Sequence, residues 1–209
     1  MEGHTEREGQ KALWDYAMLF QLAVCLLFGG FVCVGAEGID LLFLHGKFDA
    51  AASASVYFCS CLYLVGQQNN IVRDLIYRYF FGKGNTGATF RNSVAVSCAN
   101  LVLSLILVRF LGLSGIILGT VLAGLLSLVM ILVKMKKYYG LYPEFRGFLV
   151  ETARNNAVMV LSTAGVLGLK RLLPSLPGLI AIGVYGLACV GLFVVLAFLF
   201  RAKALKVRL

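Results

Sequence analysis

Hydrophobic residues form long, nearly uninterrupted runs, and charged residues are confined to the short segments between them. A helix needs about 20 apolar residues to cross a hydrocarbon core of ~30 Å. Two of the runs are shorter and borrow neighbouring residues, with Arg91 and Arg154 reaching back to the head groups. The predicted membrane-spanning helices are 16–36, 52–72, 90–108, 111–133, 150–169 and 178–200.

Continuous apolar runs disfavour a β-barrel, whose strands alternate apolar and polar residues over short segments. Helices are then the structure that satisfies every backbone hydrogen bond inside lipid. The pattern therefore predicts an all-α, polytopic membrane helix bundle with about six transmembrane helices.

The basic residues fix the expected orientation. With the N-terminus inside, fifteen of the 19 Lys and Arg residues fall in cytoplasmic segments and four fall outside, namely Lys47, Arg109, Lys170 and Arg171. This asymmetry is the positive-inside bias, so both termini are predicted to be cytoplasmic. The net charge of +9 then reflects topology and contact with anionic lipids, and no nucleic-acid partner is expected.

Local signals predict several helix ends and one packing surface. Gly46 suits a turn, Asp49 suits a helix N-cap, and Trp14 and Tyr16 are expected in an interfacial aromatic belt. Gly115, Gly119 and Ala123 recur every fourth residue, which is the small-residue spacing of a close helix–helix contact. Pro143 is expected to break the helix in the loop that precedes the fifth span.

No constellation of catalytic residues is present, so an enzyme is not predicted. The two histidines, His4 and His45, lie in a tail and a loop, which makes a histidine-based metal site or triad improbable. Gly82-x-Gly84 lacks the rest of a phosphate-binding motif. All six cysteines fall inside predicted spans and are expected to be small, buried and reduced, and no metal or cofactor is predicted.

Polar residues within or beside the spans are the remaining candidates for function. The candidates for a substrate path are Gln67, Asn69, Asn70, Arg73, Arg78 and Asn100. The alternative for each amide is a hydrogen bond between helices, and for each arginine a place at the membrane interface. Two ion pairs are also expected, Asp74 with Arg78 and Glu151 with Arg154.

Four sequence blocks in order resemble the MurJ/MviN-type lipid II flippases of the MOP superfamily of lipid-linked oligosaccharide exporters. The blocks are LLFLHGKFDA at 41–50, YFFGKGNT at 79–86, SCANLVLSLIL at 97–107 and LGLSGIILGT at 111–120. The resemblance implies that the chain matches the C-terminal portion of the family fold, from its ninth helix onward. Its ninth helix starts in the cytoplasm, as the charge count places Met1 here.

The sequence also departs from the family pattern. Asn85 stands where the family usually has Asp, Gly87-Ala88-Thr89 replaces Arg-Thr-Pro, and Ser104 replaces a second Asn. Residues 1–15 are polar and charged and are expected to form a cytoplasmic tail. The resemblance implies that 16–137 form four helices of a MOP-type C-terminal lobe. It also implies that 138–209 add two helices, which in the family border a groove thought to hold the lipid tail, and a basic tail. No residue here matches the cationic cavity residues of the N-terminal lobe.

The leading hypothesis is a C-terminal portion of a flippase for a polyprenyl-diphosphate-linked saccharide, with lipid II as the expected substrate, in the cytoplasmic membrane. The rivals are an exporter of another lipid-linked saccharide, a non-transporting scaffold subunit and, last, a membrane enzyme. The expected partners are a lipid-linked saccharide, membrane lipids and either an N-terminal lobe or a second copy. The lobe face that awaits this partner is expected to be rich in small and polar residues such as Ser55, Ser60, Asn69 and Ser97.

Overall fold

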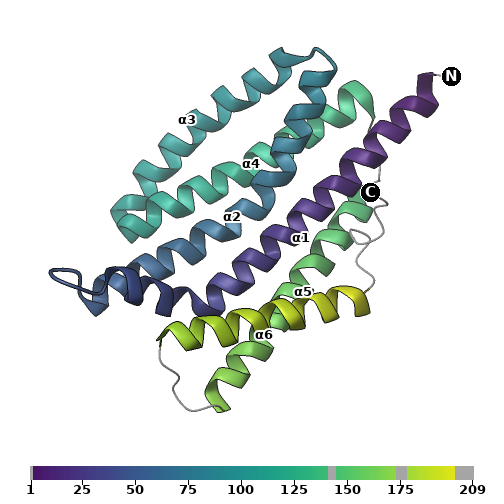
Figure 1. The fold of residues 1–209 in the computed structure, drawn as a ribbon. Coiled ribbons are helices and arrows are strands. Elements are labelled where there is room, and N and C mark those ends of the chain that lie inside the picture. The colour runs from purple at the N-terminus through teal and green to yellow at the C-terminus, as the bar shows by residue number, and fades with distance from the viewer. Residues whose placement is uncertain (1, 141–144, 173–177, 201–209) are drawn as a thin grey trace.

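A computed structural model describes residues 2–140, 145–172 and 178–200, and six α-helices account for nearly all of them. The helices are α1 (Glu2–Phe43), α2 (Ala50–Gly82), α3 (Thr86–Leu111), α4 (Leu113–Tyr139), α5 (Phe145–Leu172) and α6 (Gly178–Leu199) (Figure 1). This confirms the predicted all-α bundle, with one helix for each predicted span. Pro143 and the basic tail 201–209 lie outside the described residues.

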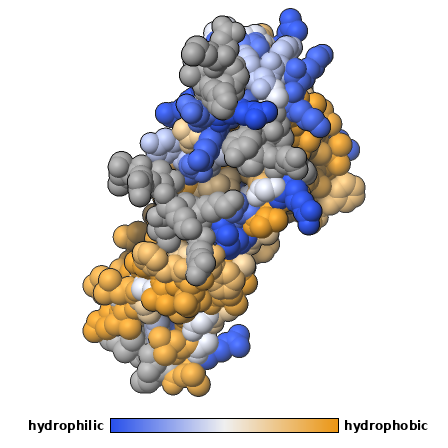
Figure 2. Space-filling view, turned by 90° about the vertical axis from the view of Figure 1, so that its right-hand side faces the viewer, coloured by the Kyte–Doolittle hydropathy of each residue, from blue (hydrophilic) through white to orange (hydrophobic). Residues whose placement is uncertain are grey.

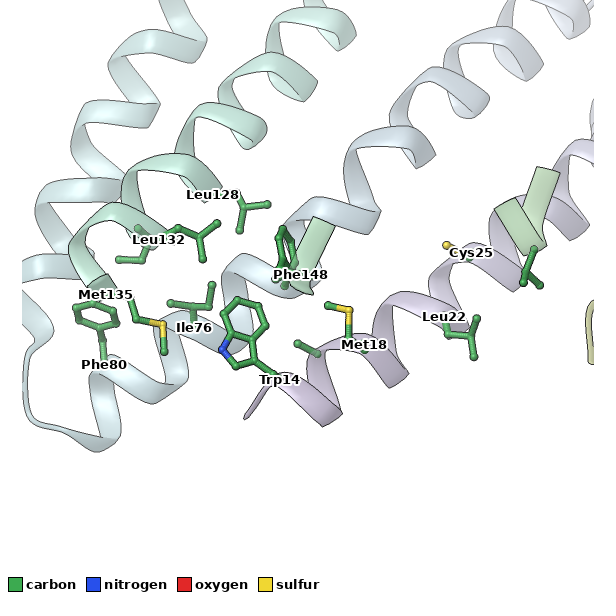
Figure 3. Close-up of a cluster of buried hydrophobic side chains, with 14 of the residues drawn as sticks. Trp14, Met18, Leu22, Cys25, Ile76, Phe80, Leu128, Leu132, Met135 and Phe148 are labelled. Atoms are coloured by element: carbon green, nitrogen blue, oxygen red, sulfur yellow. The ribbon is translucent and has the colours of Figure 1, made fainter. Parts of the chain in front are cut away.

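The helices are longer than the predicted spans, and α1 differs most. Residues 2–15, predicted to be a tail, form the first turns of α1. Trp14 does not lie in an exposed aromatic belt, because it is only 4% exposed and its ring centroid lies 5.3 Å from that of Phe148 on α5. Figure 3 shows it in the main hydrophobic cluster, beside Ile76 of α2 and Met18 of its own helix.

The local signals at Gly46 and Asp49 are confirmed. Asp49 caps α2 by accepting a hydrogen bond from the Ala52 amide at 2.8 Å, and Gly46 has a φ of 64°. Asn85 caps α3 in the same way, with 3.3 Å between its side-chain oxygen and the Ala88 amide. Gly112, with a φ of 58°, allows the one-residue turn between α3 and α4.

The predicted glycine face is the contact between α3 and α4. A Cβ atom added at Gly115 would lie 2.3 Å from the carbonyl oxygen of Leu107, and one at Gly119 would lie 2.9 Å from the amide nitrogen of Ser104. Ala123 continues this face and is 2% exposed. The two helices therefore touch through their backbones, as small residues at this spacing permit.

Five helices are long and apolar enough to cross a membrane, and within the described part of the chain α5 is the exception. Its polarity has a structural explanation, because several of its polar residues face protein. Glu151, Asn155, Ser162 and Thr163 of α5 are all buried.

The contacts of α5 run along α1 in a fixed, parallel register. Phe148 packs on Trp14, the Asn155 amide donates a hydrogen bond to Gln21, and Lys170 forms an ion pair with Glu37. Residue numbers increase together along both helices in these three contacts, so α1 and α5 run in the same direction. The span from Trp14 to Glu37 is about 35 Å at 1.5 Å per residue, which exceeds a hydrocarbon core of ~30 Å. We infer that α5 also crosses the membrane, alongside α1 and in the same direction.

The cysteines are partly as predicted. All six are free thiols, and Cys25, Cys33, Cys59 and Cys189 are buried. Cys61 is only partly buried, and Cys98 is exposed, because it lies on α3, whose most apolar window has no buried residue. A lipid-facing helix exposes small side chains as readily as large ones, so the expectation of burial was wrong for Cys98.

Labelling of single cysteines is expected to confirm the topology. On the face shown in Figure 2, hydrophilic residues lie mainly in the upper half and hydrophobic residues mainly in the lower half, with further hydrophilic residues near the lower end. In a background with Cys98 replaced by serine, cysteines at Lys47 and Lys170 should react with an impermeant maleimide from outside. Cysteines at Lys83 and Lys136 should react only after permeabilisation. Inside labelling at Lys170 would show that α5 does not cross beside α1.

Candidate functional site

One face of α2 carries polar residues at helical spacing. Gln67, Asn70 and Asp74 recur at intervals of three and four residues and so lie on the same side of the helix, and none of them is fully buried. Gln68 turns to a different side, where its amide donates to the sulfur of Met159 on α5 at 3.5 Å. Of these neighbouring amides, Gln67 and Asn70 thus face away from the α5 contact.

The neighbouring side of α4 is shaped around Asn70. A Cβ atom at Gly124 would lie 2.7 Å from the side-chain oxygen of Asn70, so glycine makes room for this amide. That oxygen is buried and has no hydrogen-bond partner within the described residues. One turn earlier on the same face of α4, Thr120 places its hydroxyl 3.1 Å from the Ile116 carbonyl.

Helix α3 completes this arrangement from the other side of α4. The Ser104 hydroxyl lies 3.2 Å from the Asn100 side-chain oxygen and 3.4 Å from the carbonyl oxygen of Ile116. Three helices therefore contribute half-buried amides and hydroxyls to a surface that is linked through Ile116, Thr120 and Gly124 of α4. We call this surface the polar band, and it consists of Gln67, Asn70, Asn100, Ser104 and Thr120.

A buried network closes the cytoplasmic end of the band, as judged from the predicted orientation. The side-chain amide of Asn92, which is fully buried, donates to the Tyr77 hydroxyl at 2.7 Å and to the Ser127 hydroxyl at 3.0 Å. The Tyr77 and Ser127 hydroxyls lie 3.3 Å apart. Because each hydrogen bond contributes a net ~1 kcal/mol, this network fixes α2, α3 and α4 relative to one another.

The structure separates the predicted site residues into two groups. Gln67, Asn70 and Asn100 belong to the polar band. Asn69 lies on another side of α2, one residue and therefore about 100° of helix rotation away from Asn70. Among the residues named for the exposed lobe face, Ser60 lies on the Gln67 side of α2, whereas Ser55 does not, by the same helical spacing.

The two arginines are not part of the band. Arg73 forms an ion pair with Asp74 at 2.8 Å and lies over the Tyr77 ring, 5.8 Å from its centroid. Asp74 is therefore paired with its neighbour instead of with Arg78, contrary to the prediction. Arg78 is exposed near the end of α2. The other predicted pair, Glu151 with Arg154, is confirmed.

Tyr77 and Ser127 were missed at the sequence level, although both carried a signal. Tyr77 follows Asn70 by seven residues on the same face of α2, and Ser127 follows Ala123 at the four-residue spacing of the glycine face. In the described residues, no group of three or more His, Cys, Asp or Glu side chains is arranged to hold a metal ion. The site offers neutral hydrogen-bonding groups, which suit a hydroxyl-rich ligand.

These features define a multi-pass α-helical membrane protein with a polar surface held among its spanning helices. Residues 3–184 match the family model of the lipid II flippase MurJ, so the chain belongs to the MurJ family of lipid II flippases.

Among solved structures, the chain is similar to a lipid II flippase MurJ in an inward closed conformation, with a TM-score of 0.75 and 16% sequence identity. The alignment covers 90% of this chain and 38% of the flippase chain, so these residues correspond to well under half of that protein. No match was found among curated protein sequences.

Proposed function

We propose that this chain forms the C-terminal part of a flippase that carries a polyprenyl-diphosphate-linked saccharide, lipid II, across the cytoplasmic membrane. Membership of the MurJ family over residues 3–184 is the observation that carries this proposal. The polar band supports it, because a saccharide head group needs hydrogen-bonding partners to replace water at membrane depth. A flippase moves its substrate without covalent chemistry, so these residues act as a binding surface and not as an enzyme.

Transport proceeds in this proposal by alternating access, in which two lobes rock about a substrate held between them. The polar band is the surface that this chain presents to the substrate. The opposing surface comes from a second lobe, supplied either by the N-terminal part of a flippase or by a second copy. The tightly packed α3–α4 pair and the network at Asn92 keep the band rigid while the lobes move.

Photo-crosslinking tests this proposal directly. A benzophenone amino acid at Gln67 or Asn100 should crosslink to radiolabelled lipid II when the purified chain is placed in lipid nanodiscs. The matched control is Val102 of α3, which is 54% exposed and lies on the side of that helix opposite Asn100. We expect at least five-fold more crosslinked product at Asn100 than at Val102.

The same experiment separates the alternatives. Equal crosslinking at the two positions would contradict a substrate role for the polar band and would favour a scaffold subunit. Stronger crosslinking to a polyprenyl-linked saccharide other than lipid II would favour an exporter of that saccharide. Competition by unlabelled lipid II should reduce the signal at Asn100 and leave the signal at Val102 unchanged.

A further inference from the structure

An apolar groove lies along α2, directly beyond one end of the polar band. Its volume is about 490 Å³, within the range of ligand-binding cavities. α2 forms the floor, and Phe31 of α1 and Ile117 of α4 belong to the two walls. The complete lining is Phe31, Val56, Cys59, Ser60, Tyr63, Leu64, Leu113 and Ile117.

Contacts behind the groove hold its walls in place. The Phe31 ring stacks on Tyr57 with 5.8 Å between centroids, and the Tyr57 hydroxyl donates to the Val32 carbonyl at 2.8 Å. On the other side, the thiol of Cys59 lies 3.8 Å from the hydroxyl of Ser114. The groove is therefore a fixed feature of the α1–α2–α4 contact.

The groove and the polar band form one amphipathic surface. Gln67 follows Tyr63 by one helical turn on the same face of α2, so the apolar lining passes directly into the amides of the band. The groove lies toward the α3–α4 turn, since Leu113 is the first residue of α4, and the band lies deeper along the helices. By the charge bias, that turn is at the outer surface.

The order of the apolar groove and the polar band along α2 favours one kind of ligand. A lipid of the inner leaflet points its chain outward and its head group toward the cytoplasm, which is the order of groove and band along α2. An outer-leaflet phospholipid would instead place its head group beside Val56 and Leu113, where the groove lining is apolar. A phospholipid head group is small, whereas the saccharide of a polyprenyl-linked lipid carries hydroxyls that extend along the band.

We propose that this groove binds the isoprenoid units nearest the diphosphate of a polyprenyl-linked saccharide that enters from the cytoplasmic leaflet. The inference rests on the proposed function and adds a chain-binding subsite to it. This subsite is separate from the smaller hollow of about 180 Å³ between α1 and α6, the latter being one of the two helices that the family resemblance associates with the lipid tail. With the chain in the groove, the diphosphate lies beside Gln67 and the sugars lie on the band.

Tryptophan quenching by brominated phospholipid tests the groove by itself. Tyr63→Trp places a reporter in the groove, and the native Trp14, which is 4% exposed, gives a constant background. In vesicles of brominated phosphatidylglycerol, undecaprenyl diphosphate without a saccharide should displace quencher and raise the reporter fluorescence at least two-fold. Val102→Trp on α3, outside the groove, should not respond, and Ser60→Phe added to the reporter should abolish the response.

Three results would overturn the proposal: no rise at saturating undecaprenyl diphosphate, an equal rise at Val102→Trp, or an equal rise with unbrominated phosphatidylglycerol. The last result would make the groove an ordinary acyl-chain site. If Tyr63→Trp does not fold, Ser60→Trp is the second reporter in the same groove. Because the probe has no saccharide, failure here together with crosslinking at Asn100 would remove the groove and leave the proposed function standing.

Discussion

Replacement of Gly115 by leucine is expected to disrupt the α3–α4 pair and to produce the largest loss of stability among single substitutions in α4. A Cβ atom at this position would lie 2.3 Å from the Leu107 carbonyl oxygen and 2.8 Å from the Val108 amide nitrogen. These are backbone atoms, so no side-chain rotation relieves the overlap, and the helices must separate. The cost should reach or exceed the upper end of the roughly 1–3 kcal/mol typical of overpacked cores.

Thermal unfolding in detergent, followed by size-exclusion chromatography, measures this effect. Gly119→Leu should behave similarly, because its Cβ atom would lie 2.9 Å from the Ser104 amide nitrogen. Gly183→Leu on α6 is the matched control, since no atom lies within 4 Å of a Cβ added there. A melting temperature of Gly115→Leu equal to that of Gly183→Leu would show that α3 and α4 do not pack through this face in the membrane.

The number of helices could be predicted because the bilayer imposes it, whereas the helices extend beyond the predicted spans. A spanning helix needs an unbroken apolar run, and charged residues are excluded from it, so the spans are visible in the sequence without any alignment. The turn at Gly46 and the cap at Asp49 follow from local chemistry. The α3–α4 contact was predictable for a related reason, since close backbone approach requires small residues at fixed spacing.

The side of each helix that packs against protein was harder to predict from the sequence. In a soluble helix the polar side marks solvent, but in lipid both sides are apolar and the pattern loses this information. Trp14 was therefore placed at an interface although it packs on Phe148, and Cys98 was expected inside although it is exposed. In α5 the polar residues do not mark a solvent-exposed side, because Glu151 and Asn155 are buried against protein.

The polar band was predicted in part, for a reason that concerns helix geometry. Gln67, Asn69 and Asn70 are nearly consecutive, so the sequence alone could not say which of them share a face with Asn100 on another helix. The register between α2 and α4, set by the fit of Asn70 against Gly124, decides this. Arg73 was a candidate because it is basic, but its charge is already paired with Asp74.

The second large effect expected is an absence of transport. Reconstituted into liposomes, the purified 209-residue chain should translocate labelled lipid II no faster than protein-free liposomes do. A diphosphate-sugar head group that crosses hydrocarbon needs a polar cavity with compensating charge, since a buried uncompensated charge costs several kcal/mol or more. Within the described residues, Arg73 and Arg154, each nine residues from an end of its helix, are already paired, Arg73 with Asp74 and Arg154 with Glu151.

Geometry leads to the same expectation for transport. The polar band is one wall of a path, and alternating access requires an opposing wall that moves relative to it. Liposomes that contain a full-length flippase of the MurJ family provide the positive control, and chemical crosslinking of the reconstituted chain reports its oligomeric state. Translocation by a monomeric chain would contradict the proposal that this chain is one part of a two-lobe transporter. Translocation that appears only with a crosslinkable dimer would show that two copies supply both walls, with the band of each copy facing the other across the substrate.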